Sequence, residues 1–262
     1  MDLISSLQNK QLKIYRSLEK RKYRRQLGLI PLEGQRLVAD VVKRGIFPEF
    51  ILLREDITLS QLSFVSLLPD NTIIYKVESK IFDKTAFTKT PQGILAVCRC
   101  PQLPLAAVFA KQPALILVAD CIQDPGNLGT MIRSAAAAGA GGVVLLPGTV
   151  DATNPKVIRA SMGTFFALPV VEASVAELLQ SLRSQGIDLV LADQDADAAY
   201  YDFDWTRPVA VAVGNEGAGI SQVVKEAAAV KLSIPMQQEV ESLNAAIAMS
   251  VLFFEASRQR RL

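Results

Sequence analysis

Three short polar stretches in the second half of the chain carry residue types that could bind a ligand or catalyse a reaction. The first is residues 124–133, with Asn127 at the start of an expected helix and Arg133 six residues later. An arginine guanidinium is a fixed cation whose planar donors suit phosphate or carboxylate groups. Taken alone, this pattern is more typical of a helix cap and a surface arginine.

Glycines dominate the second stretch, residues 213–220. Gly214, Gly217 and Gly219 let the backbone approach a ligand closely, and Glu216 places an acceptor near an expected helix N-terminus. The spacing is not that of the dinucleotide-binding motif, and no acidic residue follows about 20 positions later at a strand end. A glycine-rich turn by itself is usually only a turn.

The third stretch, residues 233–244, is a polar loop between two apolar segments. Pro235 ends a short strand, because proline cannot donate to a strand ladder. Ser242 and Asn244 stand where a helix begins, and their short side chains can accept hydrogen bonds from its free backbone N–H groups. The following helix is apolar nearly all round, so we expect cover on more than one side. A polar loop held between buried elements is typical of a rigid ligand-binding loop.

The chain contains no histidine. This excludes Ser-His-Asp chemistry and removes the commonest general base and zinc ligand. Three cysteines are too few and too odd in number for a disulfide framework, and Cys98-Arg-Cys100 alone is a weak metal motif. We therefore expect reduced thiols, a cytoplasmic protein and no metal.

Length and composition predict a two-domain protein that acts away from membranes. The chain has 262 residues, half of them hydrophobic, which is comfortable for two domains. No apolar run reaches the roughly 18 residues that a membrane span needs. The first residues lack a basic segment followed by an apolar one, so no signal peptide is expected.

Alternating strands and helices predict an α/β fold in both halves. In the first half we expect helices at 3–26, 35–44, 58–67 and 79–85 and strands at 50–53, 72–77 and 93–98. In the second half we expect strands at 114–119, 142–146, 189–192, 208–213 and 230–234 and helices at 128–138, 154–161, 176–185, 221–228 and 243–258. The second half therefore predicts an open, mostly parallel sheet with helices on both faces. Ligands bind such sheets outside the carboxyl ends of the strands, where all three polar stretches fall.

Charge is unevenly distributed although the net charge is only +2. Eight basic residues against one glutamate lie between residues 10 and 25: Lys10, Lys13, Arg16, Lys20, Arg21, Lys22, Arg24 and Arg25. Such a run suits a phosphate backbone, but a charge run by itself is more often a solvated helix face.

Taken together and in order, the three stretches resemble the three signature motifs of the SpoU (TrmH-like) branch of the SPOUT RNA methyltransferases. The matching residues are Asn127-x-Gly129-x3-Arg133-x-Ala135-x3-Gly139, then Gly214-x-Glu216-x2-Gly219, and then Ile234-Pro235-Met236 through Ser242-Leu243-Asn244 to Glu255 and Arg258-Gln259-Arg260. The N-terminal half resembles the ribosomal-protein-like substrate-binding domain that is often fused to this family. Its marks are Asn9-Lys10, the basic run and Glu33-Gly34-x-Arg36.

The resemblance implies an S-adenosylmethionine-dependent enzyme that methylates a ribose 2′-hydroxyl of RNA. It also implies a deep trefoil knot in the C-terminal domain and a homodimer with the last helix in its interface. The domains expected from it are an RNA substrate-binding domain at 1–100, a linker at 101–112 and the methyltransferase domain at 113–262. It adds no metal.

The resemblance also assigns roles to individual residues. It gives Gly214, Ile234 and Leu243 as cofactor positions and Arg133 as the catalytic arginine. The supporting polar positions of the catalytic site are Asn127, Glu216, Ser242 and Asn244. The sequence departs from the family at Gln238, where glycine is usual, and at Ala245, where valine is usual. A side chain at position 238 bears on cofactor affinity rather than on the fold.

Three functions remain open on the sequence alone. The first is methylation of ribosomal RNA, of the 23S type, with transfer RNA as the second substrate class. The second is an RNA-binding homologue with weak or no catalysis, for which Gln238 is the support. The third, an unrelated nucleotide-binding α/β enzyme, is disfavoured by the missing dinucleotide-binding motif.

Overall fold

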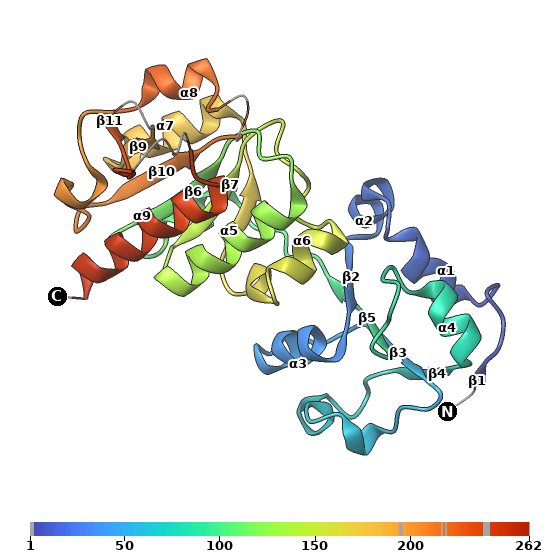
Figure 1. Ribbon diagram of the computed structural model, residues 1–262. Coiled ribbons are helices and arrows are strands. Elements are labelled where there is room, and N and C mark those ends of the chain that lie inside the picture. The colour runs from blue at the N-terminus through green and yellow to red at the C-terminus, as the bar shows by residue number, and fades with distance from the viewer. Residues whose placement is uncertain (1–2, 194–195, 216, 218, 238–241, 262) are drawn as a thin grey trace. The chain divides into compact units, whose positions relative to one another are not determined.

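The chain forms two compact units in the computed structural model, which describes residues 3–193, 196–215, 217, 219–237 and 242–261 (Figure 1). The first unit comprises Met1–Gln102 and Thr153–Phe166, and the second comprises Leu103–Ala152 and Ala167–Leu262. The domains expected from the sequence are defined by their functions, so their boundaries stay a prediction.

A five-stranded mixed sheet lies at the centre of the first unit, in the order β1-β4-β3-β5-β2. Its strands are β1 Leu3–Ile4, β2 Leu29–Glu33, β3 Phe50–Arg54, β4 Ile74–Val77 and β5 Ile94–Arg99. The strands expected from the sequence do not include β2, since proline interrupts most regular structure. In the structure β2 is an edge strand paired only with β5, a place where proline is tolerated.

The helices of the first unit correct two sequence predictions. They are α1 Lys10–Ser17, α2 Arg21–Leu27, α3 Gln35–Lys43, α4 Ser79–Thr85 and α6 Pro155–Ala160, with short 3-10 turns η1 Leu59–Gln61, η2 Val65–Leu67 and η4 Thr164–Phe166. The single helix expected at 3–26 is wrong, because Asn9 caps a new helix by accepting from the Gln11 N–H at 2.9 Å. The helix expected at 58–67 is also wrong. Leu62 and Phe64 are both buried, and residues two apart cannot share one helix face.

Arg24 does not belong to the exposed basic surface that the sequence suggested. Its side chain is only 3% exposed, and Nη1 donates to the carbonyls of Leu18 and Glu19 at 2.8 and 2.7 Å. Its Nε donates to Thr153 Oγ1 at 2.9 Å. Arg24 therefore fixes the junction between α1 and α2, whereas Lys22 and Arg25 on α2 are exposed.

Six parallel strands form the sheet of the second unit, in the order β11-β9-β10-β6-β7-β8. Their bounds are β6 Leu115–Ala119, β7 Gly142–Leu145, β8 Val170–Glu172, β9 Asp188–Ala192, β10 Val209–Val213 and β11 Val230–Leu232. The expected open parallel sheet is confirmed. Strands β6 and β10 are buried along their whole length, which explains their uninterrupted apolar sequences.

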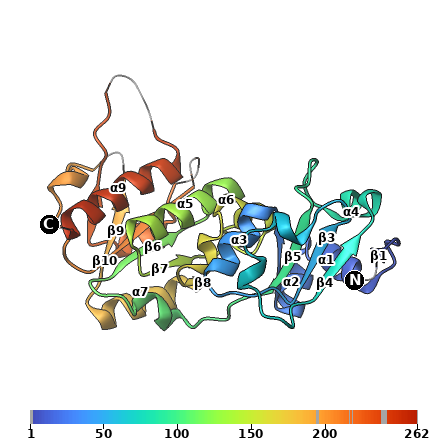
Figure 2. The same ribbon diagram turned by 90° about the horizontal axis from the view of Figure 1, so that it is seen from below.

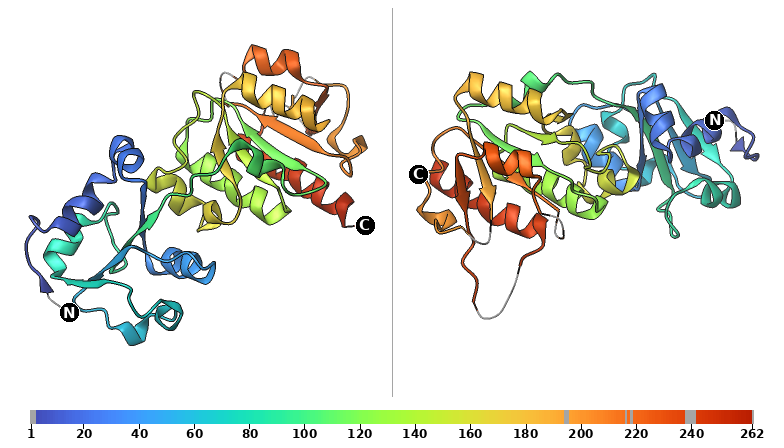
Figure 3. Two further views of the ribbon diagram at one scale, coloured as in Figure 1. Left: turned by 180° about the vertical axis from the view of Figure 1, so that it is seen from behind. Right: turned by 90° about the horizontal axis from the view of Figure 1, so that it is seen from above.

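Helices cover both faces of this sheet, as the sequence predicted. They are α5 Pro125–Ala138, α7 Val175–Gln185, α8 Gln222–Ala227 and α9 Ala245–Arg260, with 3-10 turns η3 Leu105–Phe109 and η5 Tyr200–Asp202. Helices α7 and α8 pack on one face through Leu178, Leu182 and Val224 (Figure 3). Helices α5 and α9 lie side by side on the other face (Figure 2).

The end of α9 is tied to the sheet by Arg260. Its guanidinium donates to the carbonyls of Trp205, Pro113, Ala114 and Arg207 at 2.7 to 2.9 Å. Burial lowers the pKa of Arg260, but four acceptors compensate for the loss of water. The contact joins α9 to the segments that lead into β6 and β10.

Among the residues that the structure describes, no helix is both long and apolar enough to cross a lipid bilayer.

Candidate active site

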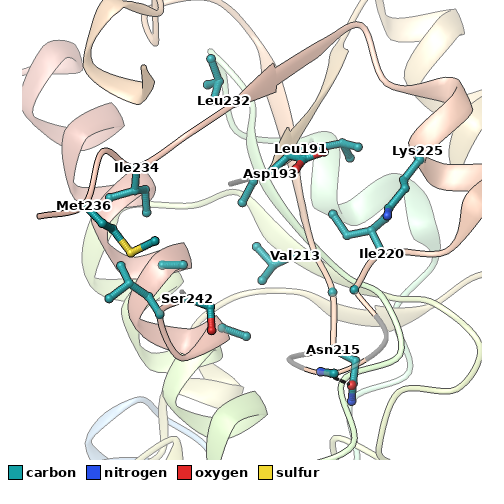
Figure 4. Close-up of a pocket in the computed structure, with 17 residues that line it drawn as sticks. Leu191, Asp193, Val213, Asn215, Ile220, Lys225, Leu232, Ile234, Met236 and Ser242 are labelled. Carbon is teal, nitrogen blue, oxygen red and sulfur yellow. Dashed lines mark hydrogen bonds between the residues drawn. The ribbon is translucent and has the colours of Figure 1, made fainter. Parts of the chain in front are cut away.

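A cavity of about 390 Å³ lies at the carboxyl ends of β9, β10 and β11, where an open parallel sheet binds ligands (Figure 4). Its volume falls within the range of about 300 to 1,000 Å³ that is usual for small-molecule sites. Leu191 and Asp193 line it from the end of β9, Val213 from β10 and Leu232 from β11. Lys225 reaches it from α8.

The loop after β10 requires glycine at its first position. A Cβ placed on Gly214 would lie 2.4 Å from both the carbonyl carbon and the oxygen of Gly219. Asn215 and Gly219 close this turn through backbone hydrogen bonds of 3.1 and 2.8 Å. Asn215 Oδ1 also accepts from the N–H of Gly217 at 2.8 Å. The loop therefore presents bare backbone to the cavity, which suits a ligand held by peptide groups.

The loop after β6 contacts the loop after β10. Asp120, only 2% exposed, accepts a hydrogen bond from the Ser221 N–H at 2.7 Å. The neighbouring Cys121 carbonyl accepts from Asn215 Nδ2 at 3.4 Å. Burial, followed by the nearby Asp120 carboxylate, raises the pKa of the Cys121 thiol. This thiol is therefore kept in its less reactive, protonated form.

The loop after β11 supplies the opposite wall of the cavity. Ile234, Met236, Ser242 and Leu243 line it. Strand β11 ends at Leu232, slightly before the expected stop at Pro235. Gln238 lies outside the described residues, so its effect on the cavity stays a prediction.

Asn244 joins the third polar stretch to the first. Its Oδ1 caps α9 by accepting from the N–H groups of Ala246 and Ile247 at 3.0 and 3.3 Å. Its Nδ2 donates to Asn127 Oδ1 at 3.1 Å. Asn127 lies in the first turn of α5, whose cap is Asp124, because the Asp124 carboxylate accepts from the Asn127 N–H at 2.7 Å. Two amides far apart in sequence thus meet beside the cavity.

The chain matches the family model for the SpoU rRNA methylases over residues 114–254, more than half of its length. It belongs to the SpoU rRNA methylase family. Residues 9–96 match the MRM3-like substrate-binding domain. Both resemblances inferred from the sequence are therefore confirmed.

Relatives and solved structures agree with this membership. The chain is 34% identical to the 23S rRNA (guanosine(2553)-2′-O)-methyltransferase RlmP of Bacillus subtilis, over 97% of this chain and 98% of that protein. A crystal structure of an RNA 2′-O ribose methyltransferase superposes with a TM-score of 0.85 at 34% identity and covers both chains completely. The SpoU methyltransferase AviRb from Streptomyces viridochromogenes, in complex with AdoMet, gives a TM-score of 0.85 at 28% identity, over 97% of this chain and 99% of that one.

The structure brings some of the predicted site residues together and leaves others apart. Gly214, Ile234, Leu243 and Ser242 line the cavity, and Asn127 and Asn244 bond beside it. Glu216 lies outside the described residues. Arg133 is exposed on α5 and is not among the described residues that line the cavity. The functional roles of all these predicted site residues stay predictions.

The sequence analysis missed four polar residues of this site. Asp193 and Lys225 line the cavity, and Asp120 and Asn215 connect two of its loops. Asp120, Asn215 and Asp193 each lie within two residues of a strand's carboxyl end, which was the available signal. Among the described residues, no group of three or more histidine, cysteine or carboxylate side chains could hold a metal ion.

Proposed function

We propose that this protein is an S-adenosylmethionine-dependent methyltransferase that modifies a ribose 2′-hydroxyl in ribosomal RNA of the 23S type. The observation that carries the proposal is that Gly214, Ile234 and Leu243, brought from two separate loops, line one cavity at the end of the sheet. RlmP is a 23S rRNA 2′-O-methyltransferase and AviRb is a SpoU methyltransferase that binds AdoMet, so both relatives point to the same reaction class.

The cavity fits a donor that is held mainly by backbone groups. Gly214 packs directly against the backbone of Gly219, so the loop borders the cavity with peptide groups there, and Ile234 and Leu243 supply apolar walls. We propose these three residues as the cofactor-binding positions. When bound, S-adenosylmethionine would supply a sulfonium methyl group, whose carbon bonds to the ribose oxygen while S-adenosylhomocysteine leaves on the opposite side. Positioning of the two reactants then accounts for much of the rate.

We assign Arg133 to the RNA rather than to the donor. An arginine guanidinium stays protonated in proteins, so it is not an ordinary general base. Its planar donors suit the phosphate next to the reacting ribose, and a nearby positive charge favours loss of the hydroxyl proton. Asn127, Glu216, Ser242 and Asn244 are proposed as supporting polar groups.

We propose that the second unit forms a homodimer through α9. Ile247 and Phe254, seven residues apart on this helix, are 54% and 49% exposed. Large apolar side chains on one helix stripe are typical of an interface. Arg133 lies exposed on α5, which packs beside α9, and we propose that it acts near the cavity of the partner subunit. A knotted C-terminal segment, as in the SPOUT family, belongs to the same proposal.

We propose residues 1–100 as the RNA-binding domain, 101–112 as a linker and 113–262 as the methyltransferase domain. Lys13, Arg16 and Lys22 are exposed on α1 and α2 and are suited to phosphate contacts. We also propose that the protein is cytoplasmic and acts on RNA, and that it binds neither a membrane nor a metal.

The test has two parts. Calorimetric titration with S-adenosylmethionine should give binding, and no binding would favour the non-catalytic alternative. Methyl transfer to 23S ribosomal RNA and to transfer RNA, with the modified ribose mapped by its resistance to alkaline cleavage, then identifies the substrate. Arg133→Ala should abolish transfer and leave donor affinity within about twofold. Equal loss of both would contradict the role given to Arg133.

A further inference from the structure

Asp120 is a buried carboxylate that the proposed reaction does not use. It directly follows β6, is 2% exposed and is not among the described residues that line the cavity. Burying a carboxylate is costly unless it is hydrogen-bonded. Asp120 accepts from the backbone N–H of Ser221 at 2.7 Å, and Ser221 is the N-cap residue of α8.

A second contact holds the other end of the same loop. The carbonyl of Cys121 accepts from Asn215 Nδ2 at 3.4 Å (Figure 4 shows Asn215 at the edge of the cavity). The segment from Asn215 to Ser221 is therefore attached to the end of β6 at both of its ends. Gly217, Gly219 and Ile220, which line the cavity, lie between the two attachments.

The backbone at this point is held in an unfavourable conformation. Cys121 has a φ of 57°, in the left-handed region that costs a residue with a Cβ about 1–2 kcal/mol. Its Sγ donates to the Pro147 carbonyl at 3.5 Å. Such strain persists only where surrounding contacts determine the conformation.

The sheet does not need the Asp120 side chain. Strand β6 is already paired with β10 and β7 over its length, and the Asp120 N–H donates to the Val213 carbonyl at 2.9 Å. The carboxylate has a hydrogen bond with the neighbouring Cys121 side chain, and its bond with the Ser221 N–H reaches the far end of the cavity loop.

We propose that Asp120 is a positioning residue for the methyl-donor site: it fixes Gly219 and Ile220 where the donor requires them, without touching the donor. The proposal rests on the proposed function only in that the donor binds in this cavity. Asp120→Ala removes the acceptor, whereas Asp120→Asn keeps an oxygen that can accept from Ser221.

The expected result is a change in donor affinity rather than in chemistry. Asp120→Ala should weaken S-adenosylmethionine binding roughly tenfold to a hundredfold, the effect expected for a hydrogen bond to a charged group. The KM for the donor should rise equally, with kcat at saturating donor within about twofold. Asp120→Asn should recover most of the affinity.

A double-mutant cycle isolates the hydrogen bond. Ser221 has a φ of −61°, which proline adopts, so Ser221→Pro removes the N–H donor without changing the backbone angle. Ser221→Pro should weaken binding in the wild-type background and have little further effect when combined with Asp120→Ala. Asp188→Ala is the control, because Asp188 pairs with Arg207 at the amino end of β9.

Calorimetric titration with S-adenosylmethionine and S-adenosylhomocysteine measures the affinity of the wild-type protein and of each variant. Thermal unfolding checks that each variant is folded. Failure of the wild-type protein to bind either compound would overturn the proposed function. With wild-type binding established, unchanged affinity in Asp120→Ala, no recovery in Asp120→Asn, or losses that simply multiply in the double variant would each overturn the positioning role.

Discussion

Adding one methyl group at Gly214 should distort the cavity loop. The Cβ of Gly214→Ala would lie 2.4 Å from the carbonyl carbon and oxygen of Gly219 and 2.6 Å from the nitrogen of Ile220. These neighbours are backbone atoms, which cannot rotate away as the end of a side chain can. Ordinary van der Waals contact begins at 3.4 Å, so the two backbone segments must separate by about 1 Å.

That displacement is large enough to open the turn. Lengthening the two Asn215–Gly219 hydrogen bonds, now 3.1 and 2.8 Å, by about 1 Å would carry both beyond hydrogen-bond distance. Overpacking of this kind costs about 1–3 kcal/mol. If the cost appears in the donor-bound state, affinity falls by roughly tenfold to a hundredfold, since 1.4 kcal/mol corresponds to a factor of ten.

Gly217→Ala is a matched control in the same loop. A Cβ on Gly217 would meet only the Asn215 side-chain oxygen, at an ordinary 3.5 Å. Because Gly217 also lines the cavity, we expect calorimetric titration with S-adenosylmethionine to show some loss of affinity for Gly217→Ala and a clearly larger loss for Gly214→Ala. Equal affinities in the two variants, both folded by circular dichroism, would refute the close-approach argument.

Three further predictions follow from particular residues. Burial raises the pKa of the Cys98 thiol to about 12, whereas the thiol in the unfolded chain loses its proton near pH 9. The free energy of unfolding should therefore fall by about 1.4 kcal/mol for each pH unit as the pH rises from 9 toward 12. Urea titrations of Cys98→Ala should lack this part of the slope, and identical slopes would contradict it. Asn244→Ala should cost about 1 kcal/mol in thermal unfolding; Asn244→Ser should restore the cap but not the bond to Asn127, so full activity in the serine variant would show that bond to be dispensable. Lys22→Ala should reduce the slope of log affinity for RNA against log salt by about one, and an unchanged slope would remove Lys22 from the phosphate contacts.

The sequence was most informative where local and long-range preferences agree. The parallel strands of the second unit are uninterrupted apolar segments because both of their faces are buried. Helix α5 ends where Gly139 adopts a left-handed conformation with φ of 85°, as its position predicted. These signals predict that the three polar stretches lie at one end of the sheet.

What could not be predicted depends on tertiary context. Pro31 breaks most regular structure, and only its place on an edge strand makes β2 possible. Arg24 resembles its basic neighbours in sequence, yet it is buried against two carbonyls. The role of Asp120 depends on a hydrogen bond to a residue about a hundred positions later, which no local pattern contains.

The hydrogen bonds that Arg260 donates to backbone carbonyls have a consequence for the synthesis of the protein. The four carbonyl acceptors lie beside β6 and β10, whereas Arg260 itself is made after every other element of the second unit. One apolar face of the sheet therefore lacks its α9 cover until the ribosome has translated this arginine. Transiently exposed apolar surface makes a partly folded chain prone to aggregate, so a ribosome that stalls before α9 should leave an aggregation-prone product.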